Sequence, residues 1–199
     1  MTRVKICGIT TPEDAQAAAE AGADAIGLNF WPGSPRCVTL ERAREIVRGL
    51  PPDVLRAGVF VDAAAEEMEE TAAGVGLDVV QLHGASNRPV RWRWWQAVSA
   101  GAPGWQLMAA ASEAEMILLD TPAGEQRGGT GRTFEWELAR ELNRPLILAG
   151  GLSPENVAAA VRLVRPWGVD ACSQLEIAPG RKDHKRILAF VRAVRESSR

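Results

Sequence analysis

The sequence predicts an α/β protein in which eight parallel strands close into a (β/α)8 TIM barrel. Short apolar runs rich in β-formers alternate with longer stretches of helical period, which is typical of repeated βα units around a parallel sheet. Several of the runs end in glycine, where the backbone can approach a ligand at the carboxyl edge of the sheet. The 199 residues leave about 25 for each of eight units, so we expect one compact barrel domain over residues 1–199.

The strands are predicted from apolar runs bounded by turn residues. Seven of them lie at residues 4–9, 25–30, 55–61, 79–83, 116–121, 145–149 and 169–173. The run at 94–99 completes a set of eight.

Two of the helices have clear start signals. Thr11-Pro12-Glu13-Asp14 places a capping residue, an N1 proline and two carboxylates before an alanine-rich run, and residues 153–156 (Ser-Pro-Glu-Asn) repeat the pattern. Further helices are predicted at 40–50, 64–75, 134–142 and 183–196.

The helix between strands 4 and 5 is predicted to be missing or irregular. Only eight residues separate Gly84 from Arg93, whereas a parallel crossover needs about a dozen or more. Two arrangements remain open. Residues 85–92 form an irregular link, or residues 88–99 form the helix and the fifth strand moves to 105–110.

Composition excludes several classes of partner. A net charge of −2 and a pI near 5.8 provide no basic field for nucleic acid or an anionic membrane. No apolar run approaches the ~18 residues that span a bilayer, and the first ten residues lack a signal sequence, so we expect a cytoplasmic protein. Three separated cysteines and two histidines exclude a disulfide scaffold and a Cys/His metal site. Arginine and tryptophan in residues 91–95 could form a nucleic-acid platform, but packing of tryptophan beside the missing helix explains them more simply.

Cys7 follows Lys5 by two residues at the end of the first strand. Both side chains therefore point to the same face, about 6.6 Å apart along the strand. If that face is the barrel interior, the ammonium favours the thiolate, which can act as a base. A small core cysteine is the alternative reading.

Asp120 ends an apolar strand, where a barrel places its catalytic groups. Strands 1 and 6 face each other across the mouth, which suits a base on one side of a sugar and an acid on the other. An N-cap or a salt bridge is the alternative role for Asp120.

Gly150 and Gly151 lead into a helix start, and loops after strands 7 and 8 often bind phosphate. His83 ends strand 4 as polar lining or a structural hydrogen-bonding residue. Residues 127–133 lack a Walker A pattern and are expected to form a mobile loop.

Motifs along nearly the whole chain resemble the phosphoribosylanthranilate isomerase family. They are Lys5-Ile6-Cys7-Gly8-Ile9-Thr10, Gly27-Leu28-Asn29-Phe30, Ser34-Pro35-Arg36, Gly58-Val59-Phe60-Val61, Gln81-Leu82-His83-Gly84, Leu118-Leu119-Asp120-Thr121, Gly128-Gly129-Thr130-Gly131, Leu148-Ala149-Gly150-Gly151-Leu152, Pro154-Glu155-Asn156-Val157, and Ala178-Pro179-Gly180 followed by Lys182-Asp183.

The resemblance implies an Amadori rearrangement without a cofactor, in tryptophan biosynthesis. Asp120 would protonate the ribose ring oxygen, and Cys7 would remove the C2 proton. Arg36 would bind the anthranilate carboxylate, a task that its planar fork suits. Other substrate-binding positions implied by the resemblance or by the strand ends are His83, Gly150, Gly151, Asp170, Ser173 and Gln174.

Asp170 is also expected to neutralise Lys5 from the adjacent strand.

Two positions depart from the family pattern. Gln174 stands where the family usually has glycine, and Cys37 where it has an aromatic residue. An alternative function is therefore a barrel that binds a sugar phosphate without turnover. A histidine-pathway Amadori isomerase fits less well, since that family uses paired aspartates. The expected partner is a small-molecule substrate, with no nucleic acid or membrane, and the chain would be a monomer or a homodimer.

Overall fold

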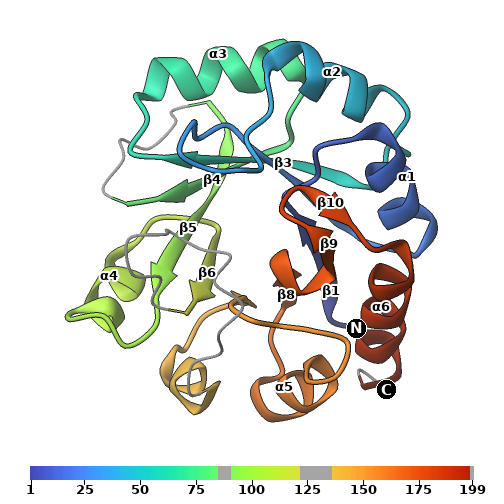
Figure 1. Ribbon diagram of the computed structural model, residues 1–199. Helices are drawn as coiled ribbons and strands as arrows, with labels where there is room; N and C mark the ends of the chain where they lie inside the picture. The colour runs from blue at the N-terminus through green and yellow to red at the C-terminus, as the bar shows by residue number, and fades with distance from the viewer. Residues whose placement is uncertain (85–90, 122–135, 198–199) are drawn as a thin grey trace.

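A computed structural model describes residues 1–84, 91–121 and 136–197. Its eight parallel strands form a closed barrel in sequence order, as predicted, and helices lie around the outside (Figure 1). Strands β1 and β8 close the ring, with Lys5 opposite Asp170. The strands are β1 (Arg3–Cys7), β2 (Ala25–Asn29), β3 (Leu55–Val61), β4 (Val79–His83), β5 (Arg93–Ser99), β6 (Met116–Asp120), β7 (Leu146–Leu148) and β8 (Gly168–Ala171).

Two of the helices begin at a threonine whose side chain caps them. Thr11 Oγ1 accepts a hydrogen bond from the backbone N–H of Asp14 at 3.1 Å, and Thr39 Oγ1 accepts one from Arg42 at 3.2 Å. The helices are α1 (Pro12–Glu20), α2 (Leu40–Arg48), α3 (Ala65–Val75), α4 (Trp105–Ala111), α5 (Val157–Val164) and α6 (His184–Ser197), with 3-10 turns η1 (Trp136–Glu141) and η2 (Ser173–Leu175).

Residues 93–99 form strand β5, so the alternative with a helix over 88–99 is wrong. Residues 105–110, which that alternative made a strand, belong to α4. Strand β5 pairs with both β4 and β6, and tertiary pairing decides an ambiguous apolar run in favour of a strand. The link at 85–90 and the glycine-rich loop at 127–133 lie outside the described residues.

Several predicted boundaries need correction. The strand expected at 4–9 ends at Cys7, and the helix expected at 40–50 ends at Arg48. Strand β8 ends at Ala171, because the chain turns into η2 instead of extending to residue 173. The helix expected from Ser153 begins at Val157; residues 154–156 form a turn in which the Ser153 carbonyl accepts from Val157 N at 3.0 Å. The helix expected at 134–142 is a 3-10 turn over the described residues 136–141.

A two-stranded hairpin was not predicted. Strands β9 (Glu176–Ala178) and β10 (Arg181–Lys182) run antiparallel, with Glu176 opposite Lys182. The hairpin follows β8 after the short turn η2, and Figure 1 shows it beside β1 and β8. Gly180 has a φ of 78°, which favours glycine in this turn.

The barrel interior is filled by side chains from alternate strand positions. Trp95 is buried there and packs edge-to-face with Trp167, at 6.3 Å between ring centroids. Trp92 lies outside the barrel wall, where its indole Nε1 donates to the carbonyl of Leu77 at 3.0 Å. Trp92 and Trp94 pack against the outer core, whereas Trp95 lies in the barrel interior and not beside the missing helix as predicted. No helix in the described part of the chain is long and apolar enough to cross a membrane.

Candidate active site

Two adjoining cavities lie at the carboxyl ends of the strands, with volumes of about 70 Å³ and 40 Å³. Asp120 and Asp170 line both. All nine residues predicted for the site line one or the other. The larger is lined by Cys7, Arg36, His83, Asp120 and Asp170, and the smaller by Asp120, Gly150, Gly151, Asp170, Ser173 and Gln174.

Cys7 ends β1 in an environment that favours its thiolate. Hydrogen bonding with the Cys172 sulfur is the largest cause, and the ammonium groups of Lys5 and Lys182 add their charges. Together these lower the pKa of Cys7 well below its usual value, although burial opposes them. The predicted effect of Lys5 is confirmed, but the largest cause is Cys172, which the sequence analysis did not include in the site.

Lys5 and Asp170 form a buried ion pair on adjacent strands. Lys5 Nζ lies 3.0 Å from Asp170 Oδ1, though not in hydrogen-bonding geometry. Burial raises the pKa of Asp170 to about 7 against the pull of Lys5. Burial opposes the charge on Lys5, but Asp170 and Cys7 outweigh it and raise the pKa of Lys5. The expectation that Asp170 faces Lys5 is confirmed, and Lys5 stays cationic beneath the thiol.

Gly27 on β2 leaves the space that this thiol and ammonium occupy. A Cβ at Gly27 would lie 2.7 Å from Cys7 Sγ and 3.0 Å from Lys5 Nζ. We therefore expect Gly27→Ala to displace the thiol and to lower kcat/KM by up to roughly 10²-fold, because small misplacements of reacting groups are costly. Steady-state kinetics beside Gly49→Ala, where a Cβ would meet nothing within 4 Å, tests this. Equal activity of the two variants would contradict it.

Asp120 ends β6 on the far side of the mouth from Cys7. Its Oδ1 accepts a hydrogen bond from the Thr121 backbone N–H at 2.7 Å, which fixes the carboxyl group. Burial raises the pKa of Asp120 to about 6, and the nearby Cys7 charge adds to the rise. A carboxylic acid with this pKa can donate a proton near neutral pH. The mouth thus pairs a thiolate with a protonable acid.

Arg36 lies on the loop after β2 and is held from the hairpin. Its Nε and Nη2 donate to Glu176 Oε1 and Oε2 at 2.8 and 2.7 Å. This two-pronged pair opposes burial and raises the pKa of Arg36, so the guanidinium is a permanent cation at the cavity wall.

His83 at the end of β4 lies beside Gln81, whose Nε2 is 2.9 Å from His83 Nε2. If Gln81 Nε2 donates, His83 Nε2 is the acceptor and Nδ1 carries the proton. The neutral ring then presents a polar edge to the cavity, consistent with the prediction of polar lining.

The smaller cavity brings together the loops after β7 and β8. Gly150 and Gly151 have φ values of 83° and 62°, and a Cβ on Gly150 would clash with Thr121. These glycines therefore allow the backbone to approach closely, as a phosphate cradle requires. Ser173 and Gln174 belong to η2 on the opposite wall. The Gln174 carbonyl accepts from Arg186 Nε at 2.6 Å, which ties this turn to α6.

Three residues of the site were missed by sequence reasoning: Cys172, Glu176 and Lys182. Cys172 follows the β8 position that pairs with Ile6, so it comes to lie beside Cys7. The hairpin register that places Glu176 opposite Lys182 has no apolar periodicity. The possible signal in the sequence was the opposite charge of Glu176 and Lys182 on either side of the Pro179-Gly180 turn.

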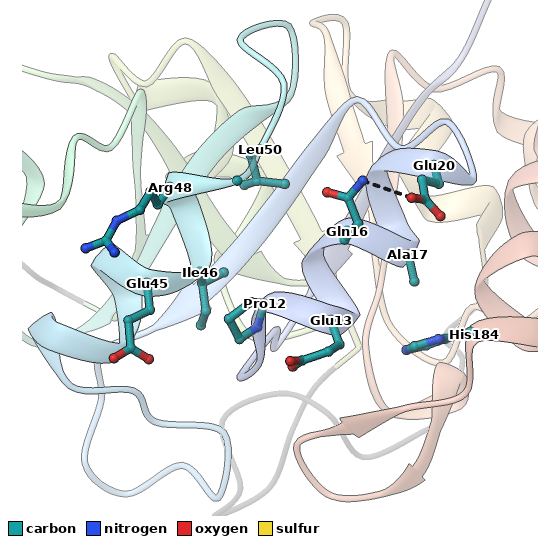
Figure 2. Close-up of a pocket in the computed structure, with 11 residues that line it drawn as sticks. Pro12, Glu13, Gln16, Ala17, Glu20, Glu45, Ile46, Arg48, Leu50 and His184 are labelled. Atoms are coloured by element: carbon teal, nitrogen blue, oxygen red, sulfur yellow. Dashed lines mark hydrogen bonds between the residues drawn. The ribbon is translucent and has the colours of Figure 1, made fainter.

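A larger crevice, of about 610 Å³, lies elsewhere, between α1 and α2 (Figure 2). Glu13, Gln16 and Glu45 line it, and Gln16 donates to Glu20 at 2.9 Å. It belongs to the outer helical layer and not to the strand ends, where barrel enzymes place their chemistry. The mouth of the barrel is therefore the candidate active site.

Fold and site together define a class: a (β/α)8-barrel enzyme equipped for general acid–base catalysis. The family model described as "N-(5'phosphoribosyl)anthranilate (PRA) isomerase" matches residues 4–193. The chain belongs to this family, as its motifs indicated, and the family's reaction is the isomerisation step of tryptophan biosynthesis.

Curated relatives and solved structures agree. The N-(5'-phosphoribosyl)anthranilate isomerase of Acidithiobacillus ferrooxidans is 45% identical over 98% of both chains. That of Pseudomonas aeruginosa is 47% identical, over 99% of this chain and 97% of the relative. The crystal structure of the Thermotoga maritima enzyme superposes with a TM-score of 0.89 at 42% identity, covering 98% of this chain and all of that one.

Proposed function

We propose that Cys7 is the base and Asp120 the acid of the family's Amadori rearrangement. The reaction converts N-(5-phosphoribosyl)anthranilate, an aminoaldose, into 1-(2-carboxyphenylamino)-1-deoxyribulose 5-phosphate, an aminoketose. The observation that carries the proposal is a thiol favoured as thiolate and a buried, protonable carboxyl group lining one cavity. The rearrangement reduces C1 and oxidises C2 of the same molecule and needs no external oxidant or reductant, so we expect no cofactor.

Asp120 acts first. Its proton passes to the ribose ring oxygen, the C1–O bond breaks, and the nitrogen lone pair forms the protonated Schiff base. Because burial raises the pKa of Asp120 to about 6, a useful fraction of the carboxyl group keeps its proton near neutral pH.

Cys7 acts second. Its thiolate removes the proton from C2, which the adjacent iminium carbon has acidified, and the electron pair forms the enolamine. The enolamine then tautomerises to the ketone. Lys5 beneath the thiol favours the ionised form of Cys7 that this step needs.

The two anionic ends of the substrate match the two cavities. Arg36 provides a cation for the anthranilate carboxylate at the larger cavity. Gly150, Gly151, Ser173 and Gln174 provide the cradle for the phosphate at the smaller. In support, one similar structure (TM-score 0.86, 40% identity) is of the isomerase in complex with reduced 1-(o-carboxyphenylamino)-1-deoxyribulose 5-phosphate.

We further propose that residues 1–199 act as one barrel domain in the cytoplasm, as a monomer or a homodimer. A similar structure from Thermotoga maritima is of monomers generated from a dimeric isomerase. Sedimentation of the purified protein over a range of concentrations distinguishes the two states.

The direct test of the function is the fall in anthranilate-type fluorescence when purified protein meets freshly formed phosphoribosylanthranilate. We expect turnover without added metal or cofactor. A folded protein that binds the reduced product analogue without consuming substrate would instead identify a binding barrel, the alternative that Gln174 left open.

A further inference from the structure

Glu176 is a buried carboxylate at the mouth that the proton transfers do not use. Its side chain is 4% exposed and occupies the Nε and Nη2 edge of Arg36 with both oxygens. Oε1 also accepts from the ammonium of Lys182 at 2.8 Å and from the Gly180 backbone N–H at 3.3 Å. Arg36 is thus tied to the β9–β10 hairpin across the end of β1.

The rest of the Arg36 side chain is confined as well. A Cβ on Gly8 would lie 2.6 Å from Arg36 Cδ, so the stem of Arg36 runs directly over the residue after Cys7. At the loop, the Arg36 backbone N–H donates to Ser34 Oγ at 3.1 Å. A long side chain with several rotatable bonds is therefore held at its base, its stem and one edge of its fork.

The remaining nitrogen, Nη1, makes no hydrogen bond to any residue that the structure describes. Because the guanidinium is planar, anchoring one edge fixes the direction of this nitrogen. Arg36 and Lys182 carry two formal positive charges beside the negative charges of Glu176 and the Cys7 thiolate, so it is the free, directed Nη1 of Arg36 that can receive an anion. The Lys182 side chain is fully buried, so its charge is poorly screened.

We propose that Glu176 is the positioning residue that aims Arg36 Nη1 at the aryl carboxylate of the substrate, and that Lys182 holds Glu176 in place for this role. The inference rests on the role proposed above for Arg36. Glu176 itself does not touch the reacting atoms. It selects a substrate that bears a carboxylate on the aromatic ring by keeping the receiving cation in one orientation.

The test compares two inhibitors, the reduced product analogue and the same compound without its ring carboxylate. We expect Glu176→Gln to weaken the carboxylate form about tenfold, to leave the carboxylate-free form within about twofold, and to raise KM with little change in kcat. Glu115→Gln is the matched control. It breaks a two-pronged Arg93–Glu115 pair of 2.8 and 2.7 Å at the opposite end of the barrel, and should change neither affinity.

Arg36→Met distinguishes the role proposed for Arg36 from the positioning role proposed for Glu176. If it does not weaken the carboxylate form selectively, the role proposed for Arg36 fails. If Arg36→Met does so and Glu176→Gln does not, the positioning role fails alone. Tighter binding of the carboxylate form by Glu176→Gln would show that Glu176 competes with substrate, and equal loss of both inhibitors would show a purely structural role. Should Glu176→Gln not fold, Glu176→Asp, which keeps the charge but shortens the reach, must show the same selective loss.

Discussion

Replacing Cys7 with serine is expected to lower kcat/KM by roughly 10² to 10⁴-fold, the usual contribution of a positioned base. A serine hydroxyl in the same place is not ionised near neutral pH, so Lys5 has no thiolate to stabilise. Binding of the reduced product analogue should remain within about twofold, because the serine side chain is no larger than the cysteine it replaces. Fluorescence decay of the substrate and titration of the analogue measure the two quantities.

Cys37→Ser is the control for this variant. Cys37 is exposed and outside both cavities, so its replacement should leave turnover unchanged. If Cys7→Ser loses analogue affinity and turnover to the same degree, the thiol has a structural role and another group is the base.

Asp120→Asn is expected to cause a loss of similar size, because the amide cannot protonate the ring oxygen. It should also change the pH profile. In the wild type, kcat/KM falls as pH rises through about 6, where Asp120 loses the proton that it must donate. On the acid side, the rate falls when Cys7 becomes protonated. The variant should keep the acid limb and lose the alkaline one.

An alkaline limb that survives in Asp120→Asn would assign the acid to another group. Asp170 is the alternative, since it lines both cavities and burial raises its pKa to about 7. The profile of Asp170→Asn, measured at the same substrate concentrations, would then show the shift instead.

Most of the barrel could be predicted because the strand and helix of each βα unit have recognisable signals in their own local sequence. The apolar runs at β3 and β4 carry the β-branched pattern, and Thr11 and Thr39 provide caps with a defined geometry. Where local signals were ambiguous, pairing between strands decided. Residues 93–99 form a strand because β4 and β6 lie on either side, which no local pattern of tryptophans reveals.

The site could be predicted as far as strand ends determine it. A strand period of two places Cys7 above Lys5, and barrel order places Asp120 opposite. The contact between Cys172 and Cys7 was harder to predict from the sequence, because Cys172 lies after the end of β8, where the chain turns into η2. The Glu176 and Lys182 pair depends on a short hairpin whose turn, Pro179-Gly180, was read only as a family motif.

In the proposed mechanism, Asp120 opens the ring and Cys7 then removes the C2 proton. The most direct test is the isotope effect on turnover of substrate made from ribose 5-phosphate deuterated at C2, measured in both variants. In Cys7→Ser, proton removal limits the rate, so we predict a large primary effect. In Asp120→Asn, ring opening limits the rate, so we predict an effect near unity. Equal effects in the two variants, or the reverse order, would contradict the assignment.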